Sequence, residues 1–332
     1  MRPHLLSMLT ILTACARSYE TVNEACPPSP PAGTDDLEAG PAAFVERVAC
    51  YRRYVGLDKG RVSVPVQTVA QSHADYIALN QSLDGSTPYP LELTNAEGFL
   101  GETLLDRLET EADLLGETDR LGSYEYVMFD ELDTSDRVER YIHDPYLRTA
   151  MLSPDLLGFG VGSTAYNSST ELTVFTTVFN WPPGQRAGRV LTYPIDGQSG
   201  IPTTFRTAQP RVDPLIALEA AGYPITVTVG EATTSRVRTN NPLGASMERS
   251  SITRLSDGAE VDHQVIEPRK STVSPWELYL PHTFIIVPEA PLIGDETYEV
   301  SVDISLKGGS SYAKTWQFST SFGAEVPGAQ LP

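Results

Sequence analysis

Side chains that could perform chemistry gather in one stretch in the first half of the chain. Glu125, Glu139 and His143 supply two carboxylates and an imidazole, and Leu147 and Arg148 follow them. Carboxylate oxygens and imidazole nitrogens bind zinc-type metal ions, and the same groups act as general acids and bases. The stretch that begins at His143, HDPYLRTAMLSPDLLGFGVGS, therefore raises the question of a metal or catalytic site.

The sequence positions of three histidines indicate structural roles. His73 lies on the apolar stripe of a predicted helix, which indicates a hydrogen-bonded core residue rather than a ligand. His143 precedes Pro145 near the end of a predicted helix, where a protonated imidazole is favourable because of the helix dipole. His282, in a predicted strand, has no nearby Cys or His.

Two further motifs resemble sites without completing them. The DELDTSD stretch holds Asp130, Glu131, Asp133 and Asp136, but it lacks the glycine and terminal glutamate of a calcium loop and indicates a solvated helix start. GFGVG follows a helix and begins a strand, which reverses the order in a dinucleotide fold, so its glycines indicate close strand packing. No G-x-S-x-G motif marks a nucleophile, although a Ser–His–Asp triad assembled in space stays open.

The elements that must position these residues fall into two groups. Apolar spacing predicts helices at 41–57, 65–80, 103–115 and 134–144, followed by strands at 157–163 and 171–180. Helices followed by strands predict an α+β domain over residues 41–182.

Beyond the WPPGQRAG linker the pattern changes to short strands. Period-2 segments separated by Gly, Pro and Asp predict an all-β sandwich over residues 190–322, followed by a tail at 323–332. A single helical interruption is expected at 212–222. The fold class is thus α+β, followed by a β-sandwich.

The N-terminus has the layout of a secretory signal. Arg2 precedes an apolar run from Leu5 to Ala14 that is too short to span a bilayer. The LTAC sequence that ends at Cys15 resembles the bacterial lipobox. This resemblance implies a signal peptide at 1–15 and lipidation of Cys15, and Ala16 favours the outer membrane. An ordinary signal peptide with a chance cysteine is the alternative.

Residues 16–40 are rich in Pro, Glu and Asp and indicate a tether between lipid and domain. With Cys15 lipidated, Cys26 and Cys50 remain in an exported chain, which favours a disulfide between them. Two separate buried thiols are the alternative.

The first domain resembles the CAP superfamily of cysteine-rich secretory and pathogenesis-related proteins. TVAQSHADYIA resembles the family helix with its A-x-x-H-A pattern, and GFLGETLLDRL resembles the G-x-x-x-x-D-R segment. YEYV, at 124–127, stands where the family has its G-E-N turn. DPYLRTAMLSPDLLGFGVG resembles the most specific motif, S-P-x-H-R followed by a Gly-rich strand. The resemblance implies an α-β-α sandwich over 41–182.

The resemblance also implies a central cleft with two histidines and two acidic residues, which bind a divalent metal in some members. Here Leu147 replaces the histidine before Arg148, and no histidine occurs near PLELTNAEG, where the second is expected. Glu125 and Glu139 match the acidic positions. We therefore expect a degenerate cleft lined by Glu125, Glu139, His143, Leu147 and Arg148, with no metal and no cofactor.

The second domain resembles a bacterial Ig-like module. YPIDGQSGIP, PEAPLIGDETYEVSVDI and TWQFST resemble its opening, middle and closing segments. Such modules pack or bind, which the resemblance implies for residues 190–322.

The composition limits the classes of molecule that this chain is expected to bind. The 332 residues carry a formal net charge of -19, which disfavours nucleic acid because phosphates repel carboxylates. We predict an exported lipoprotein of the outer membrane or cell surface, or of the periplasm, that is attached to the membrane through Cys15. We expect a non-enzymatic protein that binds a lipid, a small apolar molecule or an envelope component in the CAP-like cleft. The alternatives are a hydrolase of envelope polymers and a purely structural surface protein.

Overall fold

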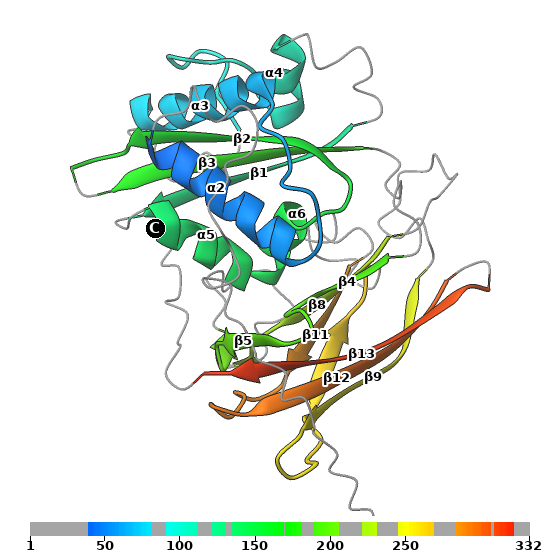
Figure 1. Cartoon of the computed structure of the whole chain (residues 1–332). Coiled ribbons are helices and arrows are strands. Elements are labelled where there is room, and N and C mark those ends of the chain that lie inside the picture. Colours follow the sequence, from blue (N-terminus) through cyan, green and yellow to red (C-terminus); the bar gives the residue numbers. More distant parts are fainter. Residues whose placement is uncertain are drawn as a thin grey trace, which may run out of the picture.

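The computed structural model describes residues 39–80, 91–111, 121–130, 134–168, 170–180, 189–205, 221–230, 245–268, 283–306 and 309–321. Within these ranges the chain is a mixed, mostly β structure in which a helical unit precedes two larger sheets (Figure 1). The helices are α2 (Ala39–Tyr54), α3 (Val64–Leu79), α4 (Leu104–Thr110), α5 (Thr134–His143) and α6 (Pro145–Met151). None of the described helices is long and apolar enough to cross a membrane.

The helical unit surrounds a three-stranded antiparallel sheet. Its strands are β1 (Leu121–Asp130), β2 (Leu156–Ala165) and β3 (Glu171–Asn180), in the order β1-β3-β2. Helices α3 and α4 lie on one face of this sheet, and α2 and α5 lie on the other (Figure 1). Alternate residues of β3 serve the two faces, because Val174 packs with Ala70 of α3 whereas Phe175 contacts Phe44 of α2.

The glycines of GFGVG admit helix α3 to the edge of the sheet. A Cβ atom at Gly162 would lie 2.1 Å from the carbonyl oxygen of Ala70, and one at Gly160 would lie 2.5 Å from the backbone of Val66. Close packing at these glycines is confirmed, but the element packed against them is helix α3 and not the expected strand.

Two glutamines of α3 complete this contact. The side-chain amide of Gln67 donates to the carbonyl of Val161 at 2.6 Å and accepts from its N–H at 2.9 Å. Gln71 makes the same pair of bonds with Ser163, both at 3.1 Å. The amides thereby satisfy backbone groups on the side of β2 that faces away from β3.

Local signals explain where the helices begin and end. Thr103 and Asp106 form a capping box at the start of α4. The side chain of Asp144 accepts hydrogen bonds from the N–H groups of Tyr146 and Leu147, and Pro145 occupies the first turn of α6. Pro145 therefore ends α5 as predicted, but it also begins a helix that the sequence analysis did not predict.

The predicted helices at 41–57 and 65–80 and the strands at 157–163 and 171–180 are confirmed by α2, α3, β2 and β3. The turn expected at YEYV is wrong. Residues 124–127 lie inside β1, which pairs with β3 along its whole length. Helix α4 is shorter than the predicted 103–115, and residues 112–115 lie outside the described ranges.

The second unit is a β-sandwich of two four-stranded sheets. One has the order β10-β11-β8-β4 and the other β5-β13-β12-β9. Side chains from both sheets, such as Phe284 and Trp316, share one core. The strand bounds are β4 (Arg189–Tyr193), β5 (Gln198–Ile201), β8 (Ile225–Gly230), β9 (Ser246–Arg254), β10 (His263–Ile266), β11 (Thr283–Pro288), β12 (Thr297–Ser305) and β13 (Ser311–Thr320). A short pair, β6 (Thr204–Phe205) and β7 (Ala221–Gly222), accompanies them.

The hydrophobic core continues from the helical unit into the sandwich. One cluster of buried side chains includes Phe44 and Tyr51 of α2 together with Tyr193, Tyr223 and Phe284. The two units therefore pack against each other in the folded chain.

Several predictions concern residues outside the described ranges. These are the signal at 1–15, most of the tether, the linker at 181–188, most of the helical segment at 212–222, and the tail at 323–332. Glu131, Asp133 and His282 also lie outside. Cys50 is buried and disulfide-bonded, whereas Cys15 and Cys26 lie outside, so the Cys26–Cys50 pairing stays a prediction.

Replacing Gly162 with alanine should destabilise the protein by roughly 1–3 kcal/mol, because the new Cβ overlaps the α3 backbone. Urea unfolding monitored by circular dichroism measures this change. Leu157→Ala, at an exposed position on the same strand, is the matched control and should change stability much less. Equal effects from the two variants would contradict the close helix–strand contact.

Candidate functional site

The residues predicted to line one cleft are distributed over the two faces of the small sheet. Glu125 points from β1 towards α3 and α4, where it contacts His73 and Arg107. Glu139, His143, Leu147 and Arg148 belong to α5 and α6, which lie across the sheet. The expectation of a single cleft formed by these five residues is therefore wrong.

The alternation of side chains along β1 explains the separation. The residue after Glu125 is Tyr126, and its ring packs edge-on against Tyr141 of α5 at a centroid distance of 6.1 Å. Because successive strand residues point to opposite faces, Glu125 must point away from α5.

On the α3 face, four ionisable side chains form a buried cluster, which we call the Arg107 cluster. Its members are His73 of α3, Glu92 of the following loop, Arg107 of α4 and Glu125 of β1. His73 Nδ1 lies 2.8 Å from Glu92 Oε1, and His73 Nε2 lies 3.5 Å from Glu125 Oε2. Arg107 donates a hydrogen bond to Glu125, and its Nε lies 3.7 Å from Glu92 Oε1.

Backbone and hydroxyl groups complete the cluster. Glu92 Oε2 accepts hydrogen bonds from the N–H groups of Leu100 at 2.8 Å and Gly101 at 3.3 Å. Glu125 Oε1 accepts from the hydroxyl of Thr176, its neighbour on β3, at 3.1 Å. Both carboxylates are thus held in one orientation.

Electrostatics stabilise the ionised form of Glu92. Burial alone would raise its pKa, but the hydrogen bonds from His73 and Leu100 and the charge of Arg107 outweigh burial and lower the pKa below its ordinary value. Glu92 therefore contributes stability that is fully present above about pH 4.5 and is lost as the pH falls through its lowered pKa.

The Arg107 cluster is closed to solvent. The side chains of His73, Glu92 and Arg107 are 0% exposed, and that of Glu125 is 1% exposed. The guanidinium lies against both carboxylates, so it supplies the positive charge that a metal ion would supply in a carboxylate–imidazole site. Among the described residues, no group of three or more His, Cys, Asp or Glu side chains is arranged to hold a metal ion.

Only part of this cluster was predicted from the sequence. His73 is the hydrogen-bonded core residue that its position on the apolar stripe predicts. Glu92 was not predicted, although it lies in the PLELTNAEG stretch, where the CAP resemblance implies a histidine. The D-R of the quoted GFLGETLLDRL motif contained Arg107, so that motif was the available signal.

On the opposite face, Glu139 is held by helix α2. Arg47 donates to Glu139 from Nε at 2.6 Å, and the hydroxyl of Tyr51 also donates to Glu139. The ring of Tyr51 contacts the ring of Tyr193 in the sandwich, with centroids 6.3 Å apart. Glu139 therefore joins α5 to α2 near the boundary between the two units.

Arg148 is the centre of the contact between the helical unit and the sandwich. Its guanidinium is 0% exposed and lies over the rings of Tyr193 and Tyr223, at 4.7 and 5.1 Å from their centroids. Its N–H groups donate to acceptors in both units: Ile142 O, His143 O, Tyr193 O, Pro224 O and Thr226 Oγ1.

His143 belongs to the same contact. Its Nδ1 lies 3.0 Å from the hydroxyl of Tyr223. Burial, followed by the nearby charge of Arg148, lowers the pKa of His143 to about 3. The protonated imidazole expected from its position at the end of α5 is therefore wrong, because the ring is neutral at pH 7.

Leu147, the residue in place of the family histidine, has an apolar role. It is partly buried and packs against the hydrophobic cluster that includes residues of α2 and the sandwich. It therefore contributes packing where the family motif would offer a ligand.

Comparisons with known proteins leave the family open. No family model matches the chain, and no curated protein matches it. An outer surface protein from Borrelia burgdorferi is 13% identical, and the match covers 44% of this chain and 96% of that protein, with a TM-score of 0.35. The copper resistance protein PcoC from Escherichia coli is 14% identical, and the match covers 42% of this chain and 99% of that protein, with a TM-score of 0.22. At these scores neither likeness assigns a fold or a function.

Replacing Arg107 with methionine should destabilise the protein by roughly 3–5 kcal/mol at pH 7, because two buried carboxylates lose their cation. The difference from wild type should narrow between pH 7 and 5, because burial without Arg107 raises the pKa of Glu92 and favours its neutral form. Urea unfolding at both pH values measures this. Arg61→Met, at an exposed position, should have little effect, and a pH-independent loss in Arg107→Met would contradict the electrostatic explanation.

Replacing Arg148 with lysine should cost about 3 kcal/mol, because an ammonium cannot reach acceptors in both units or stack between two rings. We expect unfolding to separate into two transitions, one for each unit, in differential scanning calorimetry. Arg61→Lys is the control. A single, unshifted transition in Arg148→Lys would show that the guanidinium does not couple the units.

Proposed function

We propose that this protein is an exported, lipid-anchored, non-enzymatic binding protein. In this proposal a degenerate CAP-like domain is a scaffold that holds an Ig-like β-sandwich away from the membrane. The observation that carries the proposal is the closure of the Arg107 cluster, in which a guanidinium occupies the space between the two buried carboxylates.

The arrangement of the helical unit supports the CAP-like part of the proposal. Helices cover both faces of a three-stranded antiparallel sheet, and the Gly-rich motif forms the edge strand against α3. Two four-stranded sheets with a common core support the Ig-like part. The lipobox at Cys15 and the tether at 16–40 supply the proposed attachment to the membrane.

A hydrolase of envelope polymers is disfavoured by access. His73 and Glu125 do lie close together, but their side chains are buried, and Arg107 neutralises the carboxylate that would act as a base. A general base must reach the proton that it removes within hydrogen-bond distance. Substrate cannot approach these atoms in this conformation.

A purely structural surface protein is the second candidate. It is favoured by the same filled cluster, because its four described side chains are buried and contact one another where a ligand would otherwise bind. The two candidates differ in whether another surface of the protein binds a partner. In either case, the ligand expected in the CAP cleft has no place at the Arg107 cluster.

Mass spectrometry of the full chain, exported and extracted in detergent without chelator, tests the proposal. Under denaturing conditions we expect the mass of a chain that begins at an acylated Cys15. Under native conditions we expect a mass without stoichiometric metal. We also expect no hydrolysis of peptidoglycan or envelope polysaccharide. Stoichiometric metal would overturn the proposal. So would hydrolysis that is lost in Glu125→Gln and retained in Glu102→Gln, an exposed control on the same side of the unit.

A further inference from the structure

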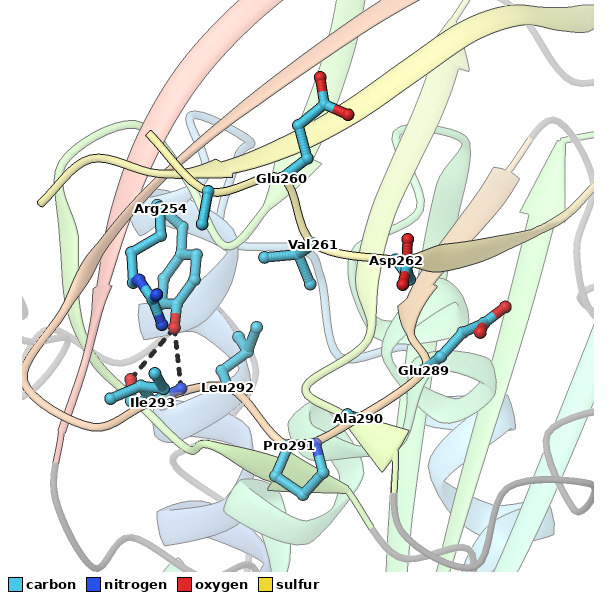
Figure 2. Close-up of a pocket in the computed structure, with 11 residues that line it drawn as sticks. Arg254, Glu260, Val261, Asp262, Glu289, Ala290, Pro291, Leu292 and Ile293 are labelled. Atoms are coloured by element: carbon cyan, nitrogen blue, oxygen red, sulfur yellow. Dashed lines mark hydrogen bonds between the residues drawn. The ribbon is translucent and has the colours of Figure 1, made fainter. Parts of the chain in front are cut away.

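A groove opens at one end of the sandwich, far in sequence from the motif residues. It lies between the β9–β10 connection and the β11–β12 connection and encloses about 480 Å³. Figure 2 shows Val261 and Leu292 pointing into it from the two connections. A volume of several hundred Å³ is typical of ligand pockets.

The floor of the groove is apolar. Val261, Pro291, Leu292 and Ile293 line it, and Ile293 is 50% exposed although its side chain is a large aliphatic group. The hydroxyl of Tyr298 accepts a hydrogen bond from the N–H of Ile293 at 2.8 Å, which fixes this wall. The groove is therefore a preformed apolar surface.

One side of the groove is acidic. Glu260, Asp262 and Glu289 line it and are exposed. The N–H of Glu289 donates to the carbonyl of Asp262 at 2.9 Å, so these two residues lie opposite each other beyond the paired ends of β10 and β11. Like charges at opposite positions repel, and the described part of the chain gives none of the three carboxylates a cationic partner.

The basic residue of the groove does not neutralise this side. Arg254 forms a bidentate pair with Asp257, with N–O distances of 3.0 and 2.5 Å. This pair lowers the pKa of Asp257 to about 2, chiefly through the side-chain hydrogen bond from Arg254. Arg254 is thus engaged at the opposite end from Asp262 and Glu289 (Figure 2).

We propose that this groove binds a peptide segment of a partner protein in which a lysine or arginine adjoins an apolar residue. The apolar side chain would lie on Val261 and Leu292, and the cationic group would lie between Asp262 and Glu289. This inference rests on the proposed binding function and names its site and partner class.

Charge complementarity supports this occupant over others. An anionic ligand is repelled by three carboxylates, and a wholly apolar ligand would desolvate them without compensation. The formal net charge of -19 also favours encounter with basic partners. A small amine would contact the carboxylates but leave the apolar floor exposed.

Fluorescence anisotropy with the mature chain tests the inference. The probe is a labelled octapeptide of alternating leucine and lysine, compared with matched octapeptides in which glutamate or glutamine replaces lysine. We expect binding of the lysine peptide only, weakened by added salt. The double variant Asp262→Asn, Glu289→Gln should weaken binding at least tenfold, whereas Glu97→Gln, Glu102→Gln in the helical unit should change it less than twofold.

A further variant separates the apolar contribution from the charge. Ile293→Ser should weaken binding of the leucine–lysine peptide but not the weaker binding of an all-lysine octapeptide. The inference is overturned by equal binding of the lysine and glutamate peptides, by full affinity in the Asp262, Glu289 double variant, or by calcium binding at these carboxylates without peptide binding. Calcium bound at these carboxylates would be lost in the Asp262, Glu289 double variant, whereas a metal bound at the Arg107 cluster would be retained in it. The failure of this inference can therefore be told apart from the failure of the proposed function.

Discussion

The burial of one guanidinium, that of Arg148, determines how the two units of this protein are joined. A fully buried charge is unfavourable unless its donors are satisfied, and Arg148 finds acceptors only when carbonyl groups of α5 and of the sandwich are both in place. The rings of Tyr193 and Tyr223 enclose its faces, and burial raises the pKa of both phenols, so they stay neutral. Arg148 therefore joins the two units of the chain, and its neighbour Leu147 packs against the hydrophobic core that the units share.

The two faces of the small sheet have different roles in the structure. The α3 face carries the Arg107 cluster, in which both carboxylates lie close to the guanidinium, and the α5 face carries the contact with the sandwich. On the α3 face the four side chains of the Arg107 cluster are buried, and on the α5 face Arg148 is buried and Glu139 is partly exposed. The exposed carboxylates that border an apolar groove lie in the sandwich, which is why the proposed binding function is placed there.

Periodicity predicted the long helices, because α2 and α3 each bury one continuous stripe, and β-branched residues predicted β3, whose valines and threonines are buried. Helix α6 was missed because Pro145 signals an end as well as a start. The site could not be assembled from spacing, because whether Glu125 meets His73 or Glu139 depends on which face of β1 it occupies. Glu92 lies in an irregular loop, and the sandwich partners of Arg148 include Tyr193 in β4 and Pro224 just before β8, which lie 45 and 76 residues further along the chain.

The glutamine contacts of α3 have a consequence for self-association. An edge strand offers a row of N–H and C=O groups that another chain can pair with, and proteins avoid aggregation by blocking such rows. Gln67 and Gln71 occupy these groups at Val161 and Ser163 with amides that imitate a neighbouring strand. The glycines of β2 allow α3 to approach closely, and its glutamines then block this edge of the sheet against pairing with a strand of a second copy. Strand β2 itself contains no charged residue and no proline that could block the edge instead.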